Sequence, residues 1–392
     1  MKFHRSLFTL MLLAFAATGT FAAAAGRGGF RPGELWMDEK GVPINAHGGG
    51  ILLHEGVYYW FGEHKIEGDA GNYAQVGVHV YSSRDLVHWR DGGIALTVSD
   101  EPKSEIAKGC IIERPKVIYN AKTKTFVMWF HLDKGRNYGM ARAALAVSDK
   151  ATGPYKYVGS FRPTQGVLPL SFDSGAAPDP DRLKDRKQFS EAVVAGDIVW
   201  RDLERGQMSR DLTLFVDDDG KGYLLTSAED NLTLHLHELT DDYRGFSGKW
   251  TRIFPNASNE APALFKRAGK YYLFTSGTSG WFPNAGRSAM ADSIWGPWTA
   301  LGNPCRGTER ENATTFESQS TYVLPVPGRP GEFIYMGDRW RPKNAIDGRY
   351  IWLPVEWENN RPVLRWHAEW DLSVFTRHNA FPSTGKDLTD LH

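Results

Sequence analysis

Gly269-Lys-Tyr-Tyr-Leu-Phe274 is one of five short segments in which a turn residue precedes apolar and aromatic residues. The other four are Gly56-Val-Tyr-Tyr-Trp-Phe61, Lys124-Thr-Phe-Val-Met-Trp-Phe130, Gly222-Tyr-Leu-Leu225 and Gly331-Glu-Phe-Ile-Tyr-Met336. Aromatic and branched residues bounded by turns are typical of β-strands, so we expect each segment to be an inner strand of a repeated unit. The first four segments along the chain are each followed by a second pattern of strand, turn and aromatic residue, as in Tyr81 to Trp89.

Five repeats of this kind predict an all-β fold, a five-bladed β-propeller, because no unit can bury its apolar face alone. A two-sheet sandwich is the alternative, but the repeat spacing has the length of a blade rather than of one strand. We expect one catalytic domain over residues 26–392. A polar insertion at about 162–208 interrupts the repeat and is expected to form a long surface loop that could include a short helix.

The N-terminus has the layout of a cleavable secretory signal, which we place at residues 1–25. Lys2 and Arg5 precede an uncharged run that ends in small alanines. The protein is therefore expected to be exported, to the periplasm or the extracellular space. No later segment has the length and apolar character of a membrane span, so we expect no membrane association after cleavage.

The charge balance argues against a polyanionic partner. Lys and Arg number 46, and Asp and Glu also number 46. Such a chain has no net positive charge for nucleic acid, and a neutral substrate fits it better. The two cysteines, Cys110 and Cys305, are too few for a disulfide scaffold, and their pairing is left open. We expect a monomer.

Four carboxylates in apolar or otherwise unusual strand contexts are the candidates for chemistry: Glu63, Glu113, Asp211 and Glu260. The inner strands of a propeller converge, so their polar side chains gather in one pocket. Burial raises the pKa of a carboxylic acid, as a general acid working near neutral pH requires. Structural ion pairs are the alternative, since Arg114 and Arg210 are adjacent to two of these residues.

The order of several motifs resembles glycoside hydrolase family 43, and within it the exo-β-1,3-galactanase group, over essentially the whole mature chain. The motifs are Ala46-His-Gly-Gly-Gly-Ile-Leu52 with Tyr58-Tyr-Trp-Phe-Gly-Glu63, Glu113-Arg-Pro-Lys-Val-Ile-Tyr-Asn120, Ser209-Arg-Asp-Leu-Thr-Leu-Phe-Val-Asp-Asp-Asp-Gly220, Asn259-Glu-Ala-Pro-Ala263 and Ser318-Gln-Ser-Thr321.

The resemblance implies hydrolysis of glycosidic bonds with inversion of configuration. Glu260 would be the general acid, and Glu113 would hold the substrate and tune the pKa of that acid. Most members of the family carry a base Asp before the first inner strand, where this chain has His47-Gly-Gly-Gly50. The galactanase group shares this absence, and there a glutamine at the position of Gln319 orients or activates the water. Gln319 could instead only bind a sugar hydroxyl.

The resemblance also implies a subsite for the terminal galactose. Its residues would be Glu63, Tyr138, Asp211, Asn231 and Thr278, and we add His47 as a binding residue. Trp281 and Trp340 either stack against sugar rings or pack in the core. The expected activity is an inverting exo-β-1,3-galactosidase or galactanase acting on polysaccharides such as arabinogalactan.

Two other activities remain open: an α-L-arabinofuranosidase or β-xylosidase of the same family, and a non-catalytic glycan-binding propeller. We expect no required cofactor and no metal in the active site. An axial calcium ion is an option that no motif of the sequence indicates.

Overall fold

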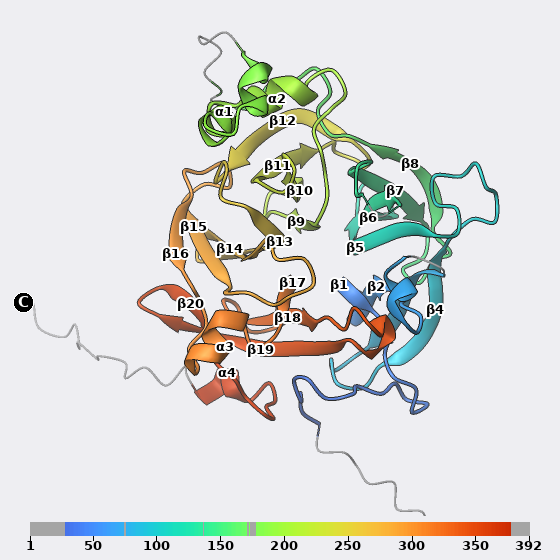
Figure 1. Ribbon diagram of the computed structural model, residues 1–392. Helices are drawn as coiled ribbons and strands as arrows, with labels where there is room; N and C mark the ends of the chain where they lie inside the picture. Colours follow the sequence, from blue (N-terminus) through green and yellow to red (C-terminus); the bar gives the residue numbers. More distant parts are fainter. Residues whose placement is uncertain (1–27, 74–75, 136, 171, 173–177, 378–392) are drawn as a thin grey trace, which may run out of the picture.

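The strands of the protein form five four-stranded antiparallel sheets around a common axis (Figure 1). The structure is a computed structural model that describes residues 28–73, 76–135, 137–170, 172 and 178–377. The all-β, five-bladed β-propeller predicted from the sequence repeats is confirmed. The signal segment at residues 1–25 lies outside the described residues.

Within each blade the strands follow one another in chain order, from the innermost to the outermost. Blade 1 comprises β1 (His47–His54), β2 (Val57–Glu63), β3 (Gly77–Ser83) and β4 (Arg90–Thr97). Blade 2 comprises β5 (Cys110–Asn120), β6 (Thr125–Lys134), β7 (Arg142–Ser148) and β8 (Lys156–Phe161). Blade 3 comprises β9 (Leu212–Val216), β10 (Gly222–Ala228), β11 (Thr233–Leu239) and β12 (Phe246–Ile253). Blade 4 comprises β13 (Asn259–Arg267), β14 (Lys270–Gly277), β15 (Arg287–Ala291) and β16 (Thr299–Gly302). Blade 5 comprises β17 (Gln319–Pro325), β18 (Phe333–Arg339), β19 (Arg349–Glu358) and β20 (Arg361–Leu364).

The repeated apolar segments are the second strands of the blades, β2, β6, β10, β14 and β18, and not the innermost ones. The expectation that they are the inner strands was therefore wrong by one position. The second strand of a blade is covered on both faces and paired on both edges, which favours a continuous apolar run. The innermost strands carry polar residues and irregular pairing at their ends, which hides their pattern in the sequence.

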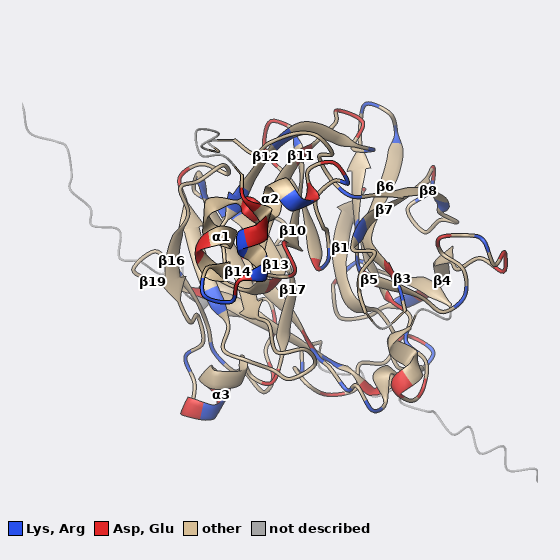
Figure 2. Cartoon of the chain, turned by 45° about the horizontal axis from the view of Figure 1, so that its top comes forward, with Lys and Arg blue, Asp and Glu red and all other residues tan. Residues whose placement is uncertain are grey.

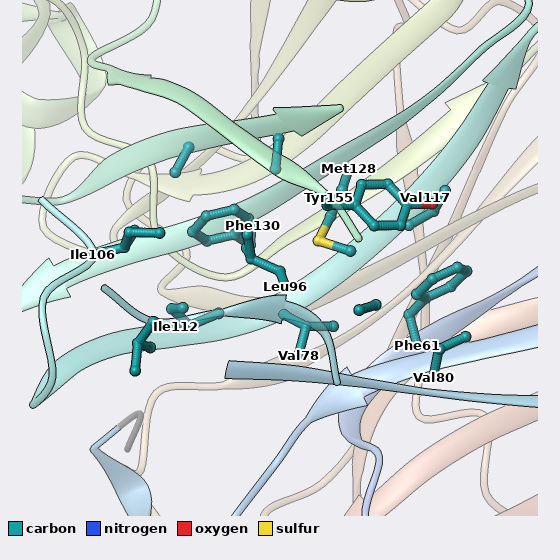
Figure 3. Close-up of a cluster of buried hydrophobic side chains, with 14 of the residues drawn as sticks. Phe61, Val78, Val80, Leu96, Ile106, Ile112, Val117, Met128, Phe130 and Tyr155 are labelled. Atoms are coloured by element: carbon teal, nitrogen blue, oxygen red, sulfur yellow. The ribbon is translucent and has the colours of Figure 1, made fainter. Parts of the chain in front are cut away.

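Each of the five hydrophobic clusters lies between two neighbouring blades. Figure 3 shows the cluster between blades 1 and 2, where Phe61 and Val78 face Met128 and Phe130. All four of these side chains are fully buried. Burying a large apolar side chain contributes roughly 1.5–3 kcal/mol, so these interfaces hold the blades together.

The ring closes between blades 5 and 1. Phe30 and Trp370, near opposite ends of the described chain, form a pair of backbone hydrogen bonds of 2.7 and 3.1 Å. Trp60 of blade 1 packs against Trp352 of blade 5, with ring centroids 4.8 Å apart. The ends of the propeller are thus joined by both strand pairing and aromatic contacts.

The helices are short and lie in the connections. They are η1 (Asp69–Asn72), η2 (Pro180–Lys184), α1 (Phe189–Ala195), α2 (Asp197–Asp202), α3 (Glu309–Thr314), η3 (Ala345–Asp347) and α4 (Val374–Arg377). The insertion at 162–208 contains η2, α1 and α2. Within the part of the chain that the structure describes, none of the helices is long and apolar enough to cross a bilayer. Cys110 and Cys305 are buried and not joined to each other.

Candidate active site

Four of the five innermost strands have a break in pairing register at one end of the propeller. The breaks fall between His47 and Gly50, Glu113 and Lys116, Glu260 and Ala263, and Ser320 and Tyr322. Arg114 and Ala261 adopt left-handed backbone angles there, with φ of 57° and 53°. A β-bulge redirects the neighbouring side chains, and these bulges turn polar groups toward a shared pocket.

The pocket is lined by nine of the eleven residues predicted for the site: Glu63, Glu113, Tyr138, Asp211, Asn231, Glu260, Trp281, Gln319 and Trp340. The structure therefore brings together residues from all five blades and their loops. The four carboxylates singled out in the sequence are among them.

Arg114 links four blades within this pocket. Its guanidinium donates hydrogen bonds to Asp211 Oδ2 at 2.9 Å, to Gln319 Oε1 at 2.6 Å and to the Ser320 carbonyl at 3.0 Å. Its backbone N–H donates to Glu63 Oε1 at 2.9 Å. The Arg114 side chain is 5 % exposed. A buried guanidinium with several fixed acceptors is well suited to hold the surrounding polar groups in place.

Glu113 is held in its ionised form. Burial opposes this charge, but His131 Nδ1 lies 3.0 Å from one carboxylate oxygen and the Tyr138 hydroxyl donates to the other at 2.9 Å, and together they lower the pKa of Glu113. Burial also works against a charged His131, yet Asp133 and Glu113 raise the pKa of that imidazole to about 9. Glu113 and His131 thus form an ion pair at neutral pH.

Glu260 is in the opposite protonation state. Burial, the negative charge of Asp211 and, more weakly, that of Glu113 raise the pKa of Glu260 to about 8. Asn231 Nδ2 donates a hydrogen bond to Glu260 Oε1 at 2.7 Å. A protonated Glu260 beside an ionised Glu113 provides one acid and one carboxylate in the same pocket, as acid catalysis at neutral pH requires.

Gln319 has its amide orientation fixed by its neighbours. Its Oε1 accepts from Arg114 at 2.6 Å and from Trp340 Nε1 at 2.9 Å, and its Nε2 donates to Ser276 Oγ at 2.9 Å. Arginine and tryptophan can only donate, so the atom facing them must be an acceptor. This geometry holds Gln319 as the ordinary amide and leaves one N–H of Nε2 to bind another group.

Two of the predicted binding residues do not line the pocket. His47 is 1 % exposed, stacks on Tyr350 and lies 3.5 Å from Asp338 Oδ1, because the start of β1 directs its ring between blades 1 and 5. Thr278 is exposed just beyond the end of β14. Gly280 and Trp281, a little further along that loop, line the pocket in its place.

Five residues that line the pocket were not predicted from the sequence: Arg114, His131, Asn137, Arg210 and Gly280. Arg114 and Arg210 were considered only as partners in ion pairs. His131 did leave a signal in the sequence, because it and Asp133 interrupt the otherwise apolar strand β6. Asn137 lies in a loop and has no such pattern.

Two lysines lie close to the residues that line the pocket. Lys65 Nζ lies 2.5 Å from Glu63 Oε2. Lys116 is 2 % exposed and donates to the carbonyls of Gly48 and Arg114 at 2.9 and 3.3 Å. Burial and, more weakly, Arg114 lower the pKa of Lys116 to about 7. Among the described residues, no group of three or more His, Cys, Asp or Glu side chains is arranged to hold a metal ion.

The chain is similar to solved glycoside hydrolases. A β-1,3-galactosidase of family GH43, solved with galactodeoxynojirimycin, is 51 % identical, with a TM-score of 0.84 over 87 % of this chain and 100 % of that chain. An exo-β-1,3-galactanase from Clostridium thermocellum is 37 % identical, with a TM-score of 0.71 over 87 % of this chain and 66 % of that one.

Two further comparisons cover less of the sequence. The family Glycosyl hydrolases family 43 matches residues 196–362. A β-xylosidase from Bacillus subtilis (strain 168) is 26 % identical over 186 residues, which are 42 % of this chain. The matched part spans only 33 % of that β-xylosidase.

Proposed function

The chain belongs to glycoside hydrolase family 43, and from this membership we propose that it is an exo-acting β-1,3-galactosidase that releases galactose from galactan-type polysaccharides with inversion. The observation that carries the proposal is the 51 % identity to a β-1,3-galactosidase along the full length of that protein. The substrate is a carbohydrate, and arabinogalactan is the kind of polysaccharide that presents such a backbone.

In the proposed reaction Glu260 is the general acid. Its pKa of about 8 keeps it protonated at neutral pH, so it can give its proton to the glycosidic oxygen as the C–O bond breaks. The Asn231 N–H binds Glu260 Oε1, which leaves the proton on the other carboxyl oxygen, Oε2.

Glu113 has two proposed roles. Its negative charge helps to keep Glu260 protonated, and its carboxylate accepts a hydrogen bond from the bound sugar. The pairing with His131 and Tyr138 fixes the position of Glu113 before substrate arrives. Preorganised polar groups of this kind need no rearrangement during the reaction.

Gln319 orients the attacking water in this mechanism and does not remove its proton. An imidic form with a proton on Oε1 would place that proton against Arg114 and Trp340, which have no acceptor to offer it. The remaining N–H of Nε2 is available to hold the water oxygen in place. Trp340 and Trp281 meet edge to face, with centroids 5.6 Å apart, and offer apolar ring surface to a sugar.

The alternatives have less support. Similarity to the β-xylosidase is lower and covers less than half of this chain. A pure glycan-binding propeller would gain little from Glu260, since a carboxyl group with a raised pKa lowers stability at neutral pH, whereas an amide in its place could both donate and accept hydrogen bonds to a sugar without that cost.

We also propose that the protein is exported after removal of residues 1–25, acts as a monomer and needs no metal. The buried guanidinium of Arg114, which joins Asp211 to the Ser320 carbonyl, places positive charge among the inner strands, and this charge disfavours an axial calcium ion. Accordingly, hydrolysis should be unchanged after exhaustive dialysis against EDTA. A loss of activity that calcium restores would contradict this.

The activity test uses β-1,3-galactan, with β-1,4-galactan, arabinan and xylan alongside, and follows the products by NMR from the first minutes. We expect free galactose from β-1,3-galactan alone, appearing first as the α-anomer. The β-anomer appearing first would refute inversion. Release of arabinose or xylose instead would favour the other activities of the family, and binding without hydrolysis would favour the lectin-like alternative.

A further inference from the structure

The turn between β10 and β11 has an unusual backbone. Glu229, Asp230 and Asn231 are consecutive residues with φ of 50°, 57° and 66°. This left-handed region is unfavourable for residues other than glycine, and three such residues in a row need to be held by their surroundings. The contacts that hold the turn come in part from the insertion at 162–208.

Glu229 connects the turn to α1. Its buried carboxylate accepts from Arg252 Nε at 2.6 Å and from Arg252 Nη2 at 2.7 Å. The same guanidinium donates to the carbonyls of Val193 and Val194 in α1, at 2.5 and 3.1 Å. Figure 2 shows α1 and α2 beside the outer strands of blade 3, with residues of both charges on the two helices.

Asp230 connects the turn to α2. Its Oδ2 accepts from Arg201 Nη1 at 2.8 Å, and the guanidinium of Arg201 also donates to both oxygens of Asp202 at 3.0 and 2.7 Å. An exposed ion pair usually contributes little to stability. Here Asp202 fixes the planar guanidinium, so less side-chain freedom is lost when Arg201 binds Asp230.

Asn231 connects the turn to the acid, because its Nδ2 donates to Glu260 Oε1 at 2.7 Å. We propose that the insertion is a positioning element for the general acid. Arg201 of α2 binds Asp230, the α1 carbonyls fix Arg252 of β12 against Glu229, and the turn held in this way directs Asn231 onto Glu260. This inference rests on the proposed function, in which Glu260 is the acid. Arg201 does not line the pocket, so its role is positioning.

The central test is Arg201→Ala. Misdirecting Asn231 should lower kcat about tenfold, because small errors in the position of reacting groups are costly, while KM changes less than twofold. Losing the Asn231 hydrogen bond disfavours the ionised carboxyl, so the basic limb of the pH profile should move to higher pH. The variant leaves in place the other charged neighbours of Glu260: Asp211, Glu113, Arg114 and Arg210. Arg201→Lys should restore part of kcat.

A double-mutant cycle decides whether Arg201 acts through Asn231. If it does, Arg201→Ala should have little further effect in an Asn231→Ala background. Arg205→Ala, which removes an exposed arginine of the same insertion outside this network, is the matched control and should leave kcat unchanged. If Arg201→Ala folds poorly, Asp230→Asn breaks the same ion pair and should also lower kcat.

The two proposals fail in different ways. Absence of hydrolysis by the wild-type protein on every glycan would reject the proposed function. Hydrolysis by the wild type, with kcat and pH profile unchanged in Arg201→Ala or with fully multiplicative losses in the double mutant, would reject the role of the insertion alone.

Discussion

The replacement Glu260→Gln should stabilise the protein at neutral pH while abolishing turnover. In the folded protein Glu260 keeps its proton up to about pH 8, whereas an ordinary glutamate loses it near 4.5. At pH 7 the raised pKa therefore lowers the free energy of unfolding by ~3.4 kcal/mol relative to a carboxyl group with an ordinary pKa. This value is ~1.36 kcal/mol per pH unit over the about 2.5 units between pH 4.5 and 7. The pocket leaves the side chain partly exposed, which reduces the expected gain to about 2–3 kcal/mol.

The pH dependence of this gain identifies its cause. Between pH 4.5 and 8 the folded state binds more protons than the unfolded state, so stability of the wild type falls as pH rises through this window. Glutamine has no such proton. We expect Glu260→Gln to raise Tm by roughly 3 °C at pH 7, given an unfolding entropy of ~2.1 cal/mol/K per residue, and by no more than about 0.5 °C at pH 4.5.

Differential scanning calorimetry at pH 4.5 and 7 measures both values, with hydrolysis assayed on the same samples. Glu55→Gln is the control, because the Glu55 side chain is 86 % exposed, and it should show no such dependence on pH. The same Tm difference at both pH values, or a less stable variant at pH 7, would refute the assignment of a buried, protonated acid.

Three further predictions concern catalysis. Initial rates should show kcat/KM falling tenfold per pH unit above about pH 8, because ionised Glu260 cannot protonate the leaving group, and a plateau to pH 9.5 would contradict this. Tyr138→Phe removes a hydrogen bond to ionised Glu113, so the pKa of Glu113 should rise. Activity at neutral pH should fall about tenfold, which is the equivalent of ~1.5 kcal/mol. The acid limb of the pH–activity profile should move to higher pH. Trp340→Phe keeps a ring but removes the donor to Gln319, so it should lower kcat more than it raises KM, and the reverse pattern would indicate a role in binding alone.

The fold was predictable because the blades repeat. The second strand of each blade is apolar and follows a turn residue, and this pattern can be read without any tertiary information. The innermost strands were harder to recognise, since β5 and β13 each combine a bulge with charged residues. Their positions depend on pairing between strands, which leaves no regular period in the sequence.

The carboxylates of the site were predictable, but the groups that connect them were not. Glu113 and Glu260 stand out because they interrupt apolar strands. Arg114 was recognised only as a neighbour of Glu113, since its links to Asp211 and Gln319 join blades that are distant in sequence. His47 was predicted to bind substrate, but its ring faces Asp338 of blade 5. A residue at the end of a strand can face either the pocket or the neighbouring blade, and the sequence does not distinguish the two.

The fixed amide of Gln319 and the raised pKa of Glu260 are consistent parts of one mechanism. In an oxocarbenium-like transition state, cleavage of the glycosidic bond runs ahead of bonding to water. The leaving oxygen then needs a proton early, and Glu260 carries that proton at neutral pH. The water needs a fixed position more than a strong base, because it becomes acidic only as its bond to carbon forms. Its proton then passes to solvent water, and Glu260, which gave its own proton to the leaving oxygen, is reprotonated from solvent before the next turnover. In the proposed mechanism, the neutral amide of Gln319, held by Arg114 and Trp340, provides that position in place of a base carboxylate at the start of β1.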